Sequence, residues 1–204
     1  AGSVTQGSSA VAVGESAGTT TQGNRAVAIG YRAGRTTQGP YTVAIGESAG
    51  LTNQAQQAVA IGTGAGTTNQ GGAAIAIGNG TAVNNQGESA IAIGNVAVLA
   101  GQGDNAIAIG NRAGGFVNPQ AANSIILNAT GVLVQNTVED AFIVKPIRNI
   151  DPVTDSTILQ YNPSTGEIFH SDKLPEIPGY YTMEYIRDAL ISSESFLEFK
   201  QNML

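Results

Sequence analysis

The sequence predicts an all-β chain whose main part is a β-solenoid, and three observations carry this prediction. A glycine recurs every 16 residues, at Gly14, Gly30, Gly46, Gly62, Gly78, Gly94 and Gly110. Each of these glycines closes a short alternating segment such as "AVAVG", "AVAIG" or "AIAIG". The chain also has 27 glycines, no Trp and only 5% aromatic residues, which does not suit a core of large side chains. A 16-residue unit with a period of two is too short for a helical repeat and fits one coil of a β-solenoid.

The alternating segment of each coil is the predicted strand. In the second coil, Val27 and Ile29 lie on one side of the strand, whereas Ala26 and Ala28 lie on the other. Neither side is polar, which predicts a strand buried on both faces. Residues 1–128 contain no pattern for a covering helix, so we expect other copies of the chain to cover one face, with alanine allowing close approach. Exposure of the alanine face to water is the alternative.

These predicted core and interface positions form two sets. The branched set comprises Val27, Ile29, Ile61, Ile77, Ile93 and Ile109, and the alanine set comprises Ala28, Ala60, Ala76, Ala92 and Ala108.

The rest of each coil comprises a turn at the repeated glycine, a second short strand near "TTQG" and a return turn. Glutamine recurs eight residues before the glycine, at Gln22, Gln38, Gln54, Gln70, Gln86 and Gln102. Amides stacked about 4.8 Å apart can form a hydrogen-bonded ladder. A ligand-facing polar strip, formed together with the neighbouring threonines, is the alternative. An ice-binding threonine row is disfavoured because Asn84 and Asn85 interrupt it.

The end of the repeat region is less regular. The spacing slips by two residues after Gly110, and Ser124–Asn128 ("SIILN") has the pattern of an atypical eighth coil. We therefore expect the β-roll to span residues 1–128.

A small β-rich module is expected over residues 129–174. The segment "TILQYNPSTGEIFHS" predicts a hairpin with one arm at Ile158–Tyr161, a Pro/Gly turn and a second arm at Ile168–Phe169. Residues 175–204 predict a Pro-containing linker and a C-terminal helix, which Thr182 can cap. This helix would pack on its own assembly or dock to a separate anchor protein.

Charge and composition exclude several classes of partner. The net charge is −6, and the residues up to 122 hold four acids and four bases. No stripe of Lys and Arg offers a footprint for nucleic acid. The chain has no Cys, hence no disulfide and no thiolate metal site. No apolar run approaches the roughly 18 residues of a membrane span, so we expect no membrane insertion.

No catalytic, cofactor or metal constellation is predicted. His170, the single histidine, stands beside Ser171 and Asp172, whereas triad members converge from separate segments, so a surface histidine is expected. The glycines of Gly62–Gly66 lack the Lys-Ser/Thr ending of a phosphate loop. Two triplets, Asn79–Thr81 and Asn128–Thr130, match the N-glycosylation pattern, which is common by chance. We therefore expect the chain not to be an enzyme.

The repeats resemble the head domains of trimeric autotransporter adhesins. The matching segments are Ala26–Gly30, Ala58–Gly62, Ala74–Gly78, Ala90–Gly94 and Ala106–Gly110. The resemblance implies a left-handed parallel β-roll, three rolls packed around an axis, and a role in surface attachment. The constant 16-residue unit is longer than is usual in that family, and the residues given after the repeats have no heptad or outer-membrane anchor pattern, so we do not expect a complete autotransporter.

Two later segments, "AFIVKPIRNI" and "TILQYNPSTGEIFHS", resemble sequences that follow such repeats in fibre and spike proteins of phages and large DNA viruses. Together the resemblances imply a homotrimeric fibre or spike protein at the virion surface with an attachment role. The alternative is the head of a bacterial cell-surface adhesin. The implied partners are the chain itself, a capsid or anchor protein at the C-terminal helix, and a host glycan or protein.

Overall fold

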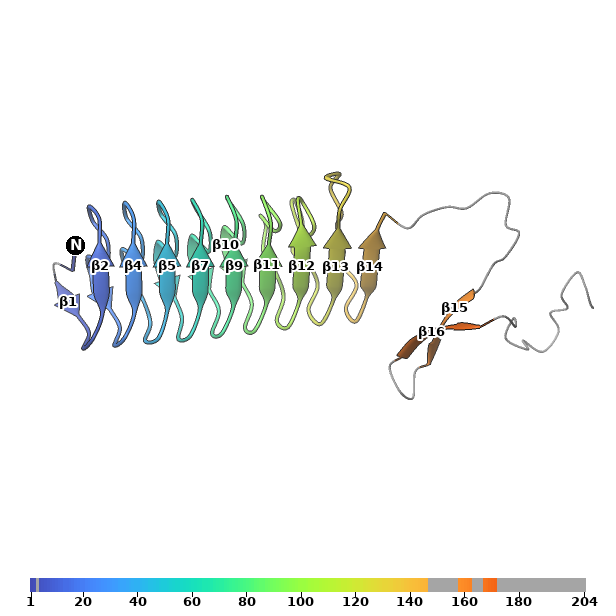
Figure 1. Ribbon diagram of the computed structural model, residues 1–204, viewed down its shortest axis with the longest axis horizontal. Helices are drawn as coiled ribbons and strands as arrows, with labels where there is room; N and C mark the ends of the chain where they lie inside the picture. The colour runs from blue at the N-terminus through green and yellow to red at the C-terminus, as the bar shows by residue number, and fades with distance from the viewer. Residues whose placement is uncertain (3, 147–157, 163–166, 172–204) are drawn as a thin grey trace, which may run out of the picture. The chain divides into compact units, whose positions relative to one another are not determined.

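The computed structural model describes residues 1–2, 4–146, 158–162 and 167–171, and the chain divides into two units, Ala1–Arg148 and Asn149–Leu204. The described residues form 16 β-strands and no helix. In the first unit the strands follow one another in stacked coils (Figure 1). The prediction of an all-β solenoid with 16-residue coils is therefore confirmed.

The long sheet of the solenoid consists of nine parallel strands, one from each coil. It comprises β2 (Val11–Val13), β4 (Val27–Ile29), β5 (Val43–Ile45), β7 (Val59–Ile61), β9 (Ile75–Ile77), β11 (Ile91–Ile93), β12 (Ile107–Gly110), β13 (Ile125–Asn128) and β14 (Phe142–Lys145). Equivalent residues pair directly: Ala60 lies opposite Ala44 on one side and Ala76 on the other. Each column of the repeat therefore becomes a row of stacked side chains.

The second side of the coil is built from very short parallel strands. They are β1 (Thr5–Gln6), β3 (Thr21–Gln22), β6 (Thr52–Gln54), β8 (Thr68–Gln70) and β10 (Asn84–Gln86). Isolated bridges at Gln38, Gln102 and Gln120 continue this row of pairings between the strands. The second strand of each coil therefore lies where the sequence predicts it, at "TTQG" and at the corresponding residues of the other coils.

The repeated glycine sets how closely successive coils approach. Gly62 has φ +122°, a conformation that residues with a side chain rarely adopt. A Cβ atom on Gly62 would lie 2.5 Å from the carbonyl oxygen of Gly78 in the next coil. The other six glycines of this column have φ between +118° and +133°. The 16-residue recurrence is thus a backbone requirement at the end of the first seven long-sheet strands, and Asn128 and Lys145 take this position in β13 and β14.

The stack of coils continues beyond residue 128, where the sequence led us to end it. β14 pairs in parallel with β13, and Ile143 lies opposite Ile126 in the inward row. The two extra residues after Gly110 lie between Gly114 and Gln120, and the register then recovers, with Ala108 opposite Ile126. The last coils keep the alternation but replace alanine by isoleucine, which hides the repeat signature.

The second unit contains an antiparallel hairpin of β15 (Ile158–Asn162) and β16 (Glu167–Ser171). Tyr161 lies opposite Ile168, and Gln160 lies opposite Phe169, in agreement with the predicted arms. The predicted linker and helix of residues 175–204 lie outside the described residues.

Candidate functional site

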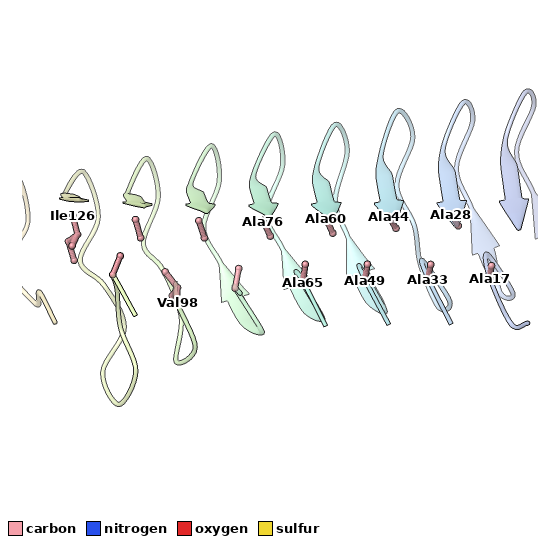
Figure 2. Packing of buried hydrophobic residues seen from close by; sticks show 14 of the residues in the cluster. Ala17, Ala28, Ala33, Ala44, Ala49, Ala60, Ala65, Ala76, Val98 and Ile126 are labelled. Atoms are coloured by element: carbon pink, nitrogen blue, oxygen red, sulfur yellow. The ribbon is translucent and has the colours of Figure 1, made fainter. Parts of the chain in front are cut away.

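The interior of the solenoid is lined with alanine. The inward alanines of the long sheet from Ala28 to Ala108 are 0% exposed in a single chain, and Ala12 in the first coil is partly buried. They face a second row from the turns, which includes Ala17, Ala33 and Ala49 (Figure 2). The alanine face therefore lies inside the coil, and the expectation that it contacts a partner chain is corrected.

The physical reason is the small distance across the coil. In most coils the two sides lie so close together that alanine faces alanine, and only the later coils bury the larger Val98, Ile126 and Val134. Methyl groups fill the space without strain at the high density that protein interiors require. The size of the side chains therefore determines which face of the strand lies inside the coil. The alternating pattern of apolar residues does not contain this information.

The branched side chains point outward and form a continuous apolar face on the long sheet. This apolar face consists of two rows, Val11, Val27, Val43, Val59, Ile75, Ile91, Ile107, Ile125 and Phe142, and Val13, Ile29, Ile45, Ile61, Ile77, Ile93, Ile109, Leu127 and Val144. Several members retain large exposed fractions, among them Val13 at 55%, Ile109 at 40% and Phe142 at 54%. With strands about 4.8 Å apart, the face is about 40 Å long. Contiguous apolar surface on this scale marks an interaction site rather than scattered exposure.

The glutamine row crosses the interior of the coil. Gln54 is 1% exposed, and its Nε2 donates to the carbonyls of Val43 at 2.9 Å and Ala58 at 3.2 Å. The same pattern of bonds recurs at Gln22, Gln70, Gln86, Gln102 and Gln120. Each glutamine therefore ties the second side of its coil to the long sheet.

Amide-to-amide bonds occur at only two steps of the glutamine row, from Gln86 to Gln102 at 3.2 Å and from Gln102 to Gln120 at 3.1 Å. The expected amide ladder is thus mainly a set of bonds to main-chain carbonyls. The row ends at Asn136, whose shorter side chain donates to the carbonyl of Val138 at 2.8 Å. Burial also rules out the alternative in which the glutamines face a ligand.

An exposed asparagine ladder that sequence reasoning missed lies on the outer surface of the second side. The Nδ2 of Asn53 donates to Asn69 Oδ1 at 3.0 Å, and that of Asn69 donates to Asn85 Oδ1 at 2.9 Å. All three residues have φ near +50°, which asparagine tolerates better than most residues. Their shared position directly before the glutamine column was the available signal.

The two long edges of the solenoid carry most of its charges. We call the turns before the long-sheet strands the leading edge and those after them the trailing edge. The leading edge carries Arg25, Glu88, Asp104, Glu139 and Asp140, and the trailing edge carries Glu15, Arg32, Glu47, Arg112 and Lys145, all exposed. Within the described part of the chain, no ion pair involves these side chains.

Two arginines are held by tyrosines near the N-terminal end. Arg25 donates to the hydroxyl of Tyr41 at 2.8 Å and lies 5.4 Å from the centre of its ring. Arg32 lies 4.7 Å from the ring centre of the adjacent Tyr31. These contacts fix the direction in which each guanidinium points.

The described residues assemble no cluster of metal ligands. No group of three or more His, Cys, Asp or Glu that could hold a metal ion occurs among them. The Gly62–Gly66 segment lies between two strands, β7 and β8, rather than before a helix. His170 lies in β16 opposite Leu159, and Asp172 is outside the described residues. The same described portion contains no helix long and apolar enough to span a bilayer.

The two glycosylation triplets lie in different environments. Asn128 is buried, and its Oδ1 accepts bonds from the backbone and hydroxyl of Thr130, which makes the triplet a turn within the last coils. Asn79 is exposed, whereas Thr81 of the same triplet is fully buried.

Comparison with known proteins adds no relative: no family model, curated protein or solved structure matches the chain.

Proposed function

We propose that the chain is a non-enzymatic structural protein of a fibre or spike, in which three copies pack their apolar faces around a common axis as left-handed β-rolls. The observation that carries this proposal is the apolar face, which runs without a polar interruption along all nine strands of the long sheet. A face of this kind needs a cover as long as itself, and a second copy of the same solenoid supplies one.

Burial of the apolar face would stabilise such an assembly substantially. Removing the exposure that remains on one Val or Ile contributes about 0.5 to 1 kcal/mol, because full burial contributes about 1.5 to 3 kcal/mol. Two residues from each of nine strands take part. The sum, about 9 to 18 kcal/mol per chain, is comparable with the association cost of about 4 to 15 kcal/mol.

The number of copies and the location rest on the two resemblances. The adhesin-like repeats support three rolls around an axis, and the later segments support placement at a virion surface with an attachment role. The head of a bacterial cell-surface adhesin is the alternative. The C-terminal segment would join the fibre to a capsid or anchor protein.

Native mass spectrometry of the full chain tests the assembly. We expect a species of three chains, and we expect Ile77→Asp to give a monomer that keeps its β-sheet circular dichroism. Asn79→Asp, an acid introduced two residues away on an exposed turn, is the matched control and should remain trimeric. A folded wild-type monomer at micromolar concentration would contradict the proposal.

A second candidate function, recognition of a host glycan, is favoured by the asparagine ladder. Its amides retain free donor and acceptor capacity at intervals of about 4.8 Å, which suits hydroxyl-rich ligands. A glycan array with the full chain, repeated with Asn69→Ala, tests this function. Equal binding by the variant would exclude the ladder as the binding surface, and no binding at all would favour a purely architectural role.

A further inference from the structure

The charges on the two edges are distributed unevenly along the stack. On the trailing edge the acids, Glu15 and Glu47, lie in the N-terminal coils, and the bases Arg112 and Lys145 lie in the C-terminal coils. The leading edge has the reverse order. Arg25 lies near its N-terminal end, and Glu88, Asp104, Glu139 and Asp140 lie toward its C-terminal end.

A rotation axis parallel to the stack places every copy in the same direction and at the same height. The trailing edge of one copy then meets the leading edge of the next, because each interface in a closed ring is formed by two different surfaces. We infer that the leading and trailing edges form ion-paired lateral contacts between copies of this chain that lie parallel and in register. This inference rests on the proposed trimer and adds the contacts that fix its register.

The pairs follow from position along the stack. Asp104 lies before β12 and Arg112 lies directly after it, so the two meet across adjacent copies at the level of β12. Glu139 and Asp140 precede β14, and Lys145 ends it, which gives a second pairing at the level of β14.

The N-terminal pairing is set by a contact within one chain. The bond from Arg25 to Tyr41 directs that guanidinium toward the turn before β5, and Glu47 follows β5. Arg32 is the exception to the trailing-edge pattern, and its guanidinium is held over its own neighbour, Tyr31.

The acids are kept apart by the same arrangement, whereas Arg25 and Arg32 both lie at the level of β4 and each is held by a tyrosine of its own chain. The trailing-edge acids lie at the levels of β2 and β5, whereas the leading-edge acids lie at the levels of β11, β12 and β14. No carboxylate therefore meets another at the same height. Complementary charges of this kind fix register and exclude wrong pairings more than they add affinity.

Cysteine cross-linking tests the contact directly, because the full chain contains no Cys. The double variant Asp104→Cys/Arg112→Cys, treated with a short bismaleimide, should yield a covalent three-chain species on a denaturing gel. The single variants should yield none. Native mass spectrometry run in parallel reports the number of chains independently of the cross-link.

The outcomes separate this inference from the proposed function. Three chains by mass spectrometry without the Asp104–Arg112 cross-link would overturn the edge contact and leave the trimer standing. A wild-type monomer would overturn both. The pair Glu47→Cys/Arg112→Cys reports an antiparallel dimer, so its cross-linking into two-chain species would also overturn both.

A charge exchange provides a second measurement without cross-linking. Arg112→Asp should raise the dissociation constant of the trimer roughly 100-fold. The trimer contains three equivalent Asp104–Arg112 contacts, and the loss of each one raises this constant about fivefold. Asp104→Arg/Arg112→Asp, which exchanges the two charges, should restore association. A double variant that associates as weakly as the single variant, while melting like wild type, would overturn the pairing.

Discussion

The inward and outward sides of the long sheet use apolar residues for different purposes. Ala60 is 0% exposed and packs inside a single chain, whereas Ile45 and Ile109, outward residues of other coils, keep 36% and 40% of their surface exposed. The small residue therefore forms the monomer's core, and the large residue is left for another surface. The difference teaches that this chain separates folding from assembly on the two faces of one strand.

The largest expected effect comes from placing an acid on each side of that strand. Ala60→Glu buries a carboxylate among methyl groups and glutamine amides whose Nε2 atoms already donate to carbonyls, so we expect loss of the folded state. Ile61→Glu places the same carboxylate on the apolar face, and the chain should remain folded as a monomer. Circular dichroism melts of both variants measure this, and a folded Ala60→Glu variant would contradict the assignment of the interior.

Gln54→Glu tests the interior through its polar row. The Nε2 of Gln54 donates to two carbonyls, and a carboxylate at this position would instead face their oxygens without a donor. We expect a loss of about 3 to 5 kcal/mol in the free energy of unfolding at neutral pH. Gln56→Glu is the control, because Gln56 is exposed two residues later, and its change should stay within about 0.5 kcal/mol. Denaturant titration that finds equal losses would show that the buried row is not a structural requirement.

The sequence was sufficient for the parts of this fold that depend on period. The 16-residue glycine column defined the coils, and strict alternation defined the strands. The sequence was insufficient where the arrangement depends on the size of a side chain or on contacts between residues far apart in the chain. Isoleucine takes the place of alanine in the inward row from Ile126 onward, so the repeat signature did not identify the last coils. The alternation in "AVAIG" also does not indicate which face of the strand lies inside the coil. The edge charges lie far apart in sequence, so only the stacked coils reveal that they line two edges.

Two nearby glycines distinguish a position facing the next coil from one facing outward. Gly62→Ala places a methyl group 2.5 Å from the Gly78 carbonyl at φ +122°, so we expect a loss of about 3 kcal/mol. Gly64→Ala, at φ +65°, meets nothing nearer than 3.6 Å, and Ser16, Arg32 and Ser48 adopt the same conformation at equivalent positions. Its loss should be about 1 kcal/mol or less. Similar melting temperatures for the two variants would refute the close approach of coils at Gly62.

The smallest expected effect is a gain in stability at Thr81. This residue occupies the turn row that alanine fills in other coils, including Ala65 and Ala97, and its hydroxyl is buried without a hydrogen-bond partner. Thr81→Val keeps the shape of the side chain and replaces the unpaired hydroxyl by a methyl group. We expect the free energy of unfolding to rise by about 1 kcal/mol, because an unsatisfied buried polar group costs about 1 to 3 kcal/mol. Thr63→Val, an exposed position on the turn of the preceding coil, is the control and should change little. A stability loss at Thr81→Val in denaturant titration would mean that the hydroxyl has a partner in solution, and the interior would then accept polar groups more readily than its alanine lining indicates.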